Sequence, residues 1–134
     1  MNGFIGGLTE YIVYGYTNKY RVYLKETDLV QPGPALTWVF LDEREDSIND
    51  GEFVVGMFGY ADKPNQWVIV DFPASYHNRA GGLSFVDGHS EIRKWRDPRT
   101  MPALKPGRSL NLYVASANNP DVFWLMERTT RKSN

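Results

Sequence analysis

The chain has 134 residues, a formal net charge of −1 and no cysteine. Its length fits one globular domain over residues 1–134, large enough to bury a hydrophobic core. The near-neutral charge argues against nucleic-acid binding, which usually comes with a basic excess, and the lack of cysteine excludes disulfides, thiolate metal sites and cysteine nucleophiles.

Short strand patterns dominate the chain up to residue 115. β-branched and aromatic residues gather in short runs that Gly- and Pro-containing turn segments interrupt. Residues 36–41 are apolar almost throughout, which predicts a strand covered on both faces. The predicted strands are 20–24, 36–41, 52–58, 67–72 and 110–115, with a β-hairpin at 83–95.

The hairpin has the clearest local signal. Asp87-Gly88 is a favoured pair for a two-residue type I′ turn, in which both residues need positive φ. That turn places Leu83 opposite Ile92. We therefore expect the side chains of Leu83, Phe85 and Ile92 to share the buried face of the hairpin.

The last predicted element is an α-helix. Asn119 is a favourable N-cap, Pro120 suits the first helical position, and Asp121 suits the positive end of the helix dipole. The helix is expected near residues 120–130, and its core stripe comprises Val122, Leu125 and Met126. Together these elements predict an α+β fold, β-rich and mainly antiparallel, with a C-terminal helix.

One stretch of the chain has a distinctive spacing of histidine, aspartate and glycine. His77 is followed by nine residues and then Asp87-Gly88, the pattern H-x9-DG. Four other segments have characteristic sequences: 41–51 (LDEREDSINDG), 73–78 (PASYHN), 97–100 (DPRT) and 118–121 (NNPD). This combination resembles the prepilin-like proteins with an H-x9-DG signature, among them the pseudopilins of type II secretion.

The resemblance implies a structural subunit that is not an enzyme. Family members begin with a leader and a long apolar helix, which anchors the subunit and builds the filament core. Residues 1–134 match only the globular head beyond that helix. We therefore expect this chain to be soluble as it stands and not to insert into a membrane alone. For the intact protein, the resemblance implies a place at the cell envelope or cell surface, with other pseudopilin subunits and the secretion machinery as partners.

The signature residues His77, Asp87 and Gly88 are interpreted as structural. His77 is expected to act as a hydrogen-bonded strut rather than a metal ligand, because a lone histidine beside a strand end usually satisfies nearby polar groups. Asp87 is explained by the turn.

The acidic segment is the better candidate for a metal site. It concentrates hard oxygen donors of the kind that Ca²⁺ prefers, without the EF-hand spacing. A solvated loop is the simpler alternative. The candidate ligands are Asp42, Glu43, Asp46, Asn49 and Asp50, with Glu45 and Glu52 beside them.

Two other functions remain open from the sequence. A carbohydrate- or peptide-binding β-module would use exposed tryptophans as a stacking platform, although aromatic residues also fill β-rich cores. Its candidates are Trp38, Trp67, Trp95 and Trp124. A hydrolase would pair Ser75 with His77, but the chain has no Gly-x-Ser-x-Gly elbow.

Overall fold

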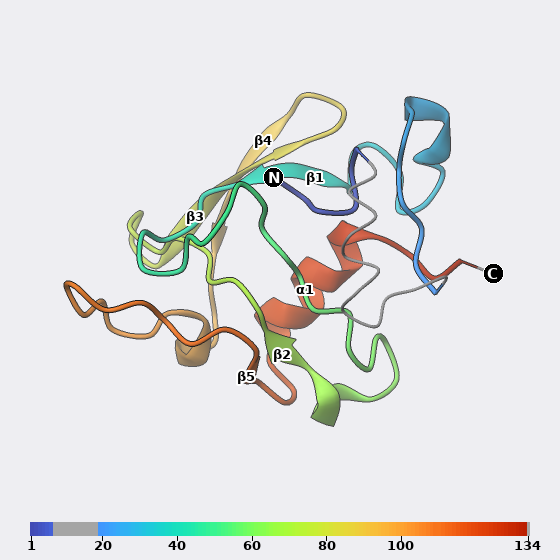
Figure 1. The fold of residues 1–134 in the computed structure, drawn as a ribbon. Helices are drawn as coiled ribbons and strands as arrows, with labels where there is room; N and C mark the ends of the chain where they lie inside the picture. Colours follow the sequence, from blue (N-terminus) through green and yellow to red (C-terminus); the bar gives the residue numbers. More distant parts are fainter. Residues whose placement is uncertain (7–18, 134) are drawn as a thin grey trace.

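The computed structural model describes residues 1–6 and 19–133. A three-stranded antiparallel sheet, in the order β1-β3-β4, lies on one side of helix α1, and the short β2–β5 pair lies at the other (Figure 1). The strands are β1 (Trp38–Leu41), β2 (Val68–Ile69), β3 (Ala80–Phe85), β4 (Ser90–Lys94) and β5 (Val114–Ala115). The helices are α1 (Pro120–Thr129) and the 3₁₀ turns η2 (Glu26–Asp28), η3 (Pro64–Gln66) and η4 (Pro98–Thr100). The predicted α+β class, mainly antiparallel with a C-terminal helix, is confirmed.

Helix α1 begins where the sequence predicts it. The side chain of Asn119 accepts hydrogen bonds from the backbone N–H groups of Asp121 (2.8 Å) and Val122 (3.4 Å). These bonds satisfy two of the donors that a helix start leaves free. The predicted core stripe of the helix is buried: Val122, Leu125 and Met126.

The hairpin register differs from the prediction by one residue. The N–H of Phe85 donates to the carbonyl of His89 (2.9 Å), and the N–H of Gly88 donates to the carbonyl of Phe85 (3.0 Å). Gly88 has φ +92°, whereas Asp87 has no positive φ. The loop therefore has three residues and ends in a left-handed glycine, instead of the predicted two-residue type I′ turn.

This shift reverses the faces of β4. Gly82 lies opposite Ile92, and Leu83 lies opposite Glu91. Leu83 and Phe85 are buried as predicted, but the Ile92 side chain is 74% exposed. Because side chains alternate along a strand, a slip of one residue moves Ile92 from the core face to the solvent face.

Other predicted strands are shorter than expected or missing. Residues 36–41 contribute β1, but Phe40 is 59% exposed, so the expectation of a strand covered on both faces is wrong. Residues 20–24 and 52–58 form only isolated bridges, for example Tyr23 with Ile5 and Phe53 with Asn2. Residues 53–57 are nevertheless all buried. The apolar pattern of residues 53–57 therefore indicates burial in the core, and a segment without regular strand pairing can be buried as well as a strand.

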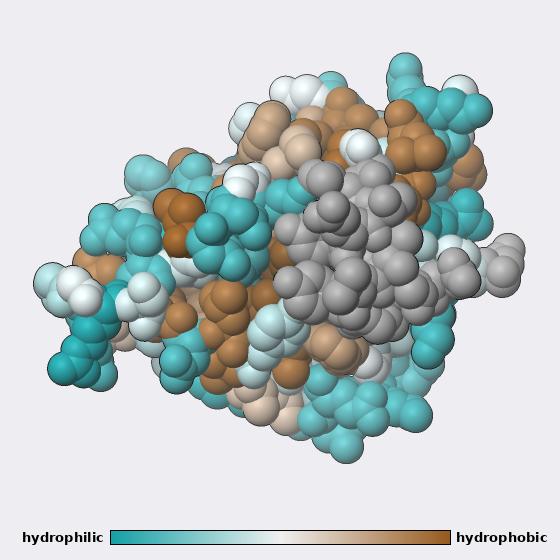
Figure 2. All heavy atoms as spheres, viewed as in Figure 1, coloured by the Kyte–Doolittle hydropathy of each residue, from teal (hydrophilic) through white to brown (hydrophobic). Residues whose placement is uncertain are grey.

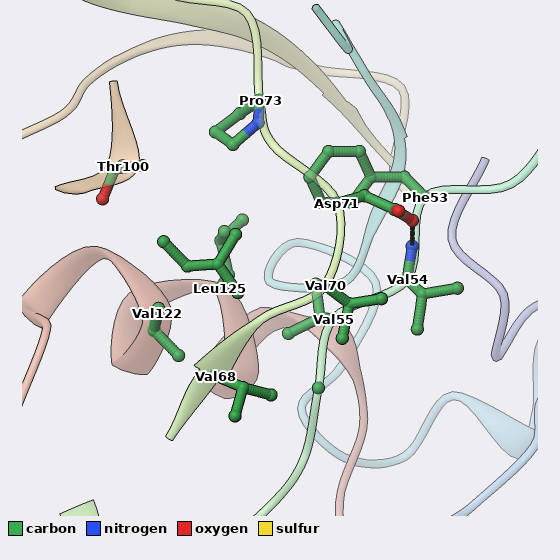
Figure 3. A pocket seen from close by; sticks show the side chains of 12 residues that line it. Phe53, Val54, Val55, Val68, Val70, Asp71, Pro73, Thr100, Val122 and Leu125 are labelled. Atoms are coloured by element: carbon green, nitrogen blue, oxygen red, sulfur yellow. Dashed lines mark hydrogen bonds between the residues drawn. The ribbon is translucent and has the colours of Figure 1, made fainter. Parts of the chain in front are cut away.

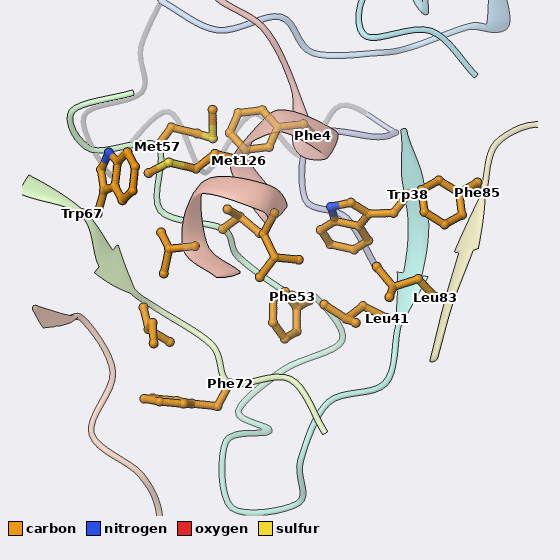
Figure 4. Close-up of a cluster of buried hydrophobic side chains, with 14 of the residues drawn as sticks. Phe4, Trp38, Leu41, Phe53, Met57, Trp67, Phe72, Leu83, Phe85 and Met126 are labelled. Carbon is orange, nitrogen blue, oxygen red and sulfur yellow. The ribbon is translucent and has the colours of Figure 1, made fainter. Parts of the chain in front are cut away.

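The core lies between the sheet and α1. Trp38 from β1 and Met126 from α1 are fully buried, and the rings of Trp38 and Phe53 meet edge to face at 5.8 Å (Figure 4). The indole N–H of Trp38 donates to the hydroxyl of Thr129 (3.0 Å), which ties the sheet to the end of the helix. Within residues 1–6 and 19–133, no helix has the length and apolar character needed to cross a bilayer.

Candidate functional site

The H-x9-DG stretch includes all of β3, and its histidine and its aspartate lie beyond opposite ends of that strand. His77 precedes β3, in a turn where Asn78 and Arg79 both have positive φ. The backbone N–H of His77 donates to the carbonyl of Ala80 (3.2 Å), while its imidazole is exposed. Asp87 lies beyond the far end of β3, roughly 20 Å away for a strand of this length. His77 and Asp87 therefore do not share one site.

Asp87 organises the hairpin tip. Its Oδ1 accepts from the backbone N–H of His89 (3.2 Å) and contacts the imidazole Nδ1 (2.5 Å). Hydrogen bonding from His89 lowers the pKa of Asp87, and the carboxylates of Asp87 and then Glu91 raise the pKa of His89. The imidazole also stacks on Phe85 at 4.3 Å. All of these contacts are local to the hairpin tip.

The acidic segment is attached directly to the hairpin. The N–H of Asp42 donates to the carbonyl of Gly82 (3.0 Å), and the N–H of Gly82 donates to Asp42 Oδ2 (3.1 Å). The carbonyl of Asp42 accepts from the N–H of Ala74 (2.7 Å). Asp42 thus joins the acidic segment, residues 73–78 and β3.

Arg44 fixes the next part of the same segment. Its guanidinium is buried and binds Asp46 in bidentate fashion, with distances of 2.6 and 2.9 Å, and it also donates to the carbonyl of Pro102 (2.5 Å). The hydrogen bond from Arg44 lowers the pKa of Asp46. The hydroxyl of Ser47 accepts from the N–H of Phe72 (2.8 Å). Planar bidentate pairs of this kind hold a fixed geometry.

The double glycine of β3 permits close packing. The indole N–H of Trp95 donates to the carbonyl of Ala74 (2.9 Å). A Cβ atom on Gly81 would lie 2.7 Å from that same carbonyl oxygen, and one on Gly82 would lie 2.8 Å from Asp42 Oδ2. Glycine inside a strand commonly marks such a close approach.

A second polar cluster joins the segments 97–100 and 118–121. Both carboxylate oxygens of buried Asp121 accept from the N–H of Arg96, and Oδ2 also accepts from the N–H of Asp97 and the hydroxyl of Thr100, at 2.8–3.1 Å. The amide of Asn119 donates to the hydroxyl of Thr100 (3.0 Å). Sequence reasoning treated Asp121 only as a helix-dipole residue, because the sequence does not reveal its distant partners.

The predicted calcium ligands are divided among different contacts. Asp42 binds Gly82, Asp46 binds Arg44, and Asp50 accepts from the backbone N–H of Glu52 (2.8 Å). Asn49 and Glu45 are exposed. Among the described residues, no group of three histidine or acidic side chains is placed to hold a metal ion.

Glu43 lies in a different environment from the other acidic residues. Burial, followed by the negative charge of Asp71, raises the pKa of Glu43 to about 7. Burial and the charge of Asp50 raise the pKa of Asp71 to about 6, although the Val54 N–H donates to its carboxylate. One buried oxygen of Glu43 and one of Glu52 have no hydrogen-bond partner among the described residues. The negative charges of Glu43 and Asp71 therefore destabilise the folded state when both carboxyl groups are ionised.

The aromatic residues do not form the open platform that a carbohydrate-binding module needs. Trp38, Trp67 and Trp95 are buried, and Trp124 is half-buried beneath the guanidinium groups of Arg93 and Arg128. On the part of the face in Figure 2 that the described residues form, hydrophobic residues make several separate groups among polar ones. Exposed hydrophobic residues scattered in this way are normal for a protein surface.

The cavity beside α1 is too small for a substrate. It has a volume of about 10 Å³ and is lined mainly by apolar residues, including Val55, Val68 and Leu125 (Figure 3). Such a volume holds at most one water molecule. The Asp71 carboxylate points to the N–H of Val54 at 2.5 Å, and neither Ser75 nor His77 lines this cavity.

Comparison with known proteins adds no relative: no family model, no curated protein and no solved structure matches the chain.

Proposed function

We propose that residues 1–134 form the globular head of a pseudopilin-like protein, a non-enzymatic structural subunit of a type II secretion or type IV pilus-like assembly at the cell envelope. The intact protein would assemble with other pseudopilin subunits and the secretion machinery. One observation supports this proposal above the others. The polar residues of the segments that resemble the family are used in contacts that hold the fold together.

Asp42 and Arg44, from the acidic segment, bind β3, Asp46 and the chain near Pro102. Asp121 and Asn119, from the 118–121 segment, bind the 97–100 segment. In an enzyme, several such groups would instead converge on a cleft where a reacting atom fits. Here these polar side chains bind other parts of the same fold. Such contacts suit the head of a filament subunit, which must keep its shape.

The alternatives have less support from the geometry. A Ser75–His77 hydrolase needs the two side chains in contact beside an open cleft, and none of the hydrogen bonds of the described residues joins them. A β-module needs aromatic rings open to solvent, and three of the four tryptophans are buried.

The test uses the intact protein in its native cells. An antiserum raised against residues 19–133 should detect a product that becomes larger when the prepilin peptidase is inactivated, because the leader is retained. In normal cells the antigen should fractionate with the envelope and with sheared surface filaments. An unchanged size without the peptidase, together with antigen confined to the cytosol, would overturn the proposal. Ester or glycoside turnover by the purified chain that is lost on Ser75→Ala would overturn its non-enzymatic part.

A further inference from the structure

Among the strands of residues 1–6 and 19–133, β4 is an edge strand with no neighbour on one side. It is the last strand in the order β1-β3-β4, and Ser90, Ile92 and Lys94 are all exposed. At the hairpin end of β4, the N–H of Phe85 donates to the carbonyl of His89 (2.9 Å). At the other end of β4, the N–H of Trp95 donates to the carbonyl of Arg79 (2.9 Å). Hydrogen-bonded pairs alternate along an antiparallel ladder. Glu91 and Arg93 therefore bond to β3, and the backbone groups of Ser90, Ile92 and Lys94 point outward.

The neighbouring backbone is covered, so the free edge has defined limits. At the opposite edge of the sheet, the N–H of Asn2 donates to the carbonyl of Val39 (2.8 Å). Just beyond β4, the carboxylate of Asp121 accepts from the N–H of Arg96. Along β4 itself, no hydrogen bond from another described residue reaches the outward groups. An edge of this kind is a template for one more strand.

The sequence of β4, Ser-Glu-Ile-Arg-Lys, is complementary to itself in one antiparallel arrangement. With Ile92 opposite Ile92 of a second copy, the outward groups of Ser90 face those of Lys94, and both sets of N–H and carbonyl groups can pair. Glu91 then faces Arg93 of the second copy, and Arg93 faces its Glu91. These are the non-hydrogen-bonded positions, where opposing Cα atoms are only about 4.5 Å apart. Opposite charges stabilise such cross-strand pairs.

Charge also selects this register against its neighbours. A shift must move by two residues to keep outward groups facing outward groups. One such shift places Glu91 opposite Glu91, and the other places Arg93 opposite Arg93. Like charges directly opposite each other are destabilising. Edge charges often prevent pairing, but here the order of the two signs favours a single arrangement.

Arg93 forms no ion pair within 4 Å with another described residue, although the negative charges of Asp121 and Glu91 are nearby. Its guanidinium carbon lies 4.5 Å from the centre of the Trp124 ring, and that of Arg128 lies 4.2 Å from the same ring. The Nε of Arg93 is buried without a hydrogen-bond partner. Two guanidinium groups therefore meet at one ring beside the free edge, and Glu91 and Glu127 of the same chain are also near Arg128. A carboxylate from a second copy would complement the guanidinium group of Arg93.

We infer that two copies of this chain associate through β4, antiparallel about a twofold axis at Ile92, so that their two sheets become one continuous sheet. The contact is isologous, because each copy offers the same edge and the same Glu91 and Arg93. It also covers Ile92, which is otherwise 74% exposed on the outer face of the sheet. This inference does not depend on the proposed function.

The decisive experiment is a charge-reversal series followed by analytical ultracentrifugation over a wide range of protein concentration. The unmodified chain should show a monomer–dimer equilibrium. Glu91→Arg and Arg93→Glu should each be monomeric, because each opposes like charges at both non-hydrogen-bonded pairs. An equimolar mixture of the two variants should dimerise again, because every basic side chain of one then meets an acidic side chain of the other. Glu45→Arg, the same charge change at an exposed site away from β4, should dimerise normally.

Two further measurements keep the result interpretable. Arg93 contacts Trp124, so circular dichroism must show that its variant is folded; Glu91 is exposed, and Glu91→Arg tests the contact even if Arg93→Glu does not fold. Hydrogen exchange should show the Ile92 and Lys94 amides becoming protected as concentration rises, while the Glu91 and Arg93 amides are protected throughout. A chain that stays monomeric at the highest attainable concentration, or a dimer that Glu91→Arg leaves intact, would overturn the inference.

Discussion

Asp42 and Gly82 are joined by two hydrogen bonds that run in opposite directions. The N–H of Asp42 donates to the carbonyl of Gly82 (3.0 Å), and the N–H of Gly82 donates to the Asp42 carboxylate (3.1 Å). Next to it, Gly81 faces the carbonyl of Ala74, which also accepts from the Trp95 indole. The absence of side chains at these two glycines is what lets three distant segments of the chain meet.

The two glycines should respond differently to an added methyl group. In Gly81→Ala the new Cβ would lie 2.7 Å from a backbone oxygen, which cannot move without displacing residues 73–78. In Gly82→Ala it would meet the end of the Asp42 side chain, which can rotate away at the cost of one hydrogen bond. We expect Gly81→Ala to lower the free energy of unfolding by about 2–3 kcal/mol and Gly82→Ala by about 1 kcal/mol. Urea unfolding of both variants measures the difference.

The double variant Gly82→Ala/Asp42→Ala serves as the control. If the added methyl group acts only by displacing the carboxylate, removing that carboxylate first should make the glycine substitution nearly free of cost. Equal losses for Gly81→Ala and Gly82→Ala would contradict the distinction between a backbone and a side-chain obstacle.

Asp121→Asn should be among the most damaging single-atom changes in the chain. The buried carboxylate accepts from the N–H groups of Arg96 and Asp97 and from the hydroxyl of Thr100. With its oxygen at the Oδ2 position, asparagine still accepts from all three donors, but its NH2 group then replaces Oδ1 and opposes the N–H of Arg96. The three bonds also lose the charge of the carboxylate, so we expect a loss of about 1–3 kcal/mol in unfolding free energy. Asp97→Asn changes a less buried carboxylate that caps η4, and it should lower the unfolding free energy by less. Thermal unfolding of both variants measures the difference.

Gly88 should tolerate asparagine better than valine. Its φ of +92° lies in the left-handed region, and nothing lies within 4 Å of a built Cβ, so only backbone strain opposes a side chain there. Asparagine adopts positive φ far more readily than a β-branched residue. We expect a loss of about 1 kcal/mol for Gly88→Asn and more for Gly88→Val. Identical melting temperatures for the two variants would show that the hairpin tip does not need this conformation.

The part of the fold that the sequence predicted depends on local signals. The start of α1 was predictable because Asn119 and the residues that it caps are neighbours in the chain. The hairpin was predictable, but its register was not, because Asp87-Gly88 is compatible with a two-residue loop and with a three-residue loop that ends in a left-handed glycine. Only tertiary packing distinguishes the two, by burying Leu83 and Phe85 without Ile92.

The site was harder to predict because its contacts are distant in the sequence. Asp42 meets a glycine of β3, and the Arg44–Asp46 pair reaches the backbone at Pro102. From the sequence alone, the same carboxylates form a dense acidic segment, and calcium is a reasonable hypothesis for it. The sequence contains the charges of this segment but not the groups that each of them binds.

Glu43 should make the protein less stable as the pH rises. Burial and the nearby charge of Asp71 raise the pKa of Glu43 to about 7, above the ordinary value of 4.5 that it has in the unfolded chain. Between these two values the unfolded chain releases the proton while the folded chain retains it, so stability falls as pH increases through this window. Above about pH 7 the full cost of the buried charge is present, and below about pH 4.5 it is absent.

Glu43→Gln should therefore raise the melting temperature at pH 8 and leave it nearly unchanged at pH 4.5. Because Glu43 is only partly buried, the gain at pH 8 is expected to be about 1 kcal/mol, or a few degrees. Glu45→Gln, at an exposed position two residues further along, should change neither value. A residual slope is expected in Glu43→Gln, since burial also raises the pKa of Asp71 to about 6. If the slope is fully preserved, Asp71 carries the pH dependence, and Asp71→Asn, whose side-chain oxygen can still accept from Val54, should remove it.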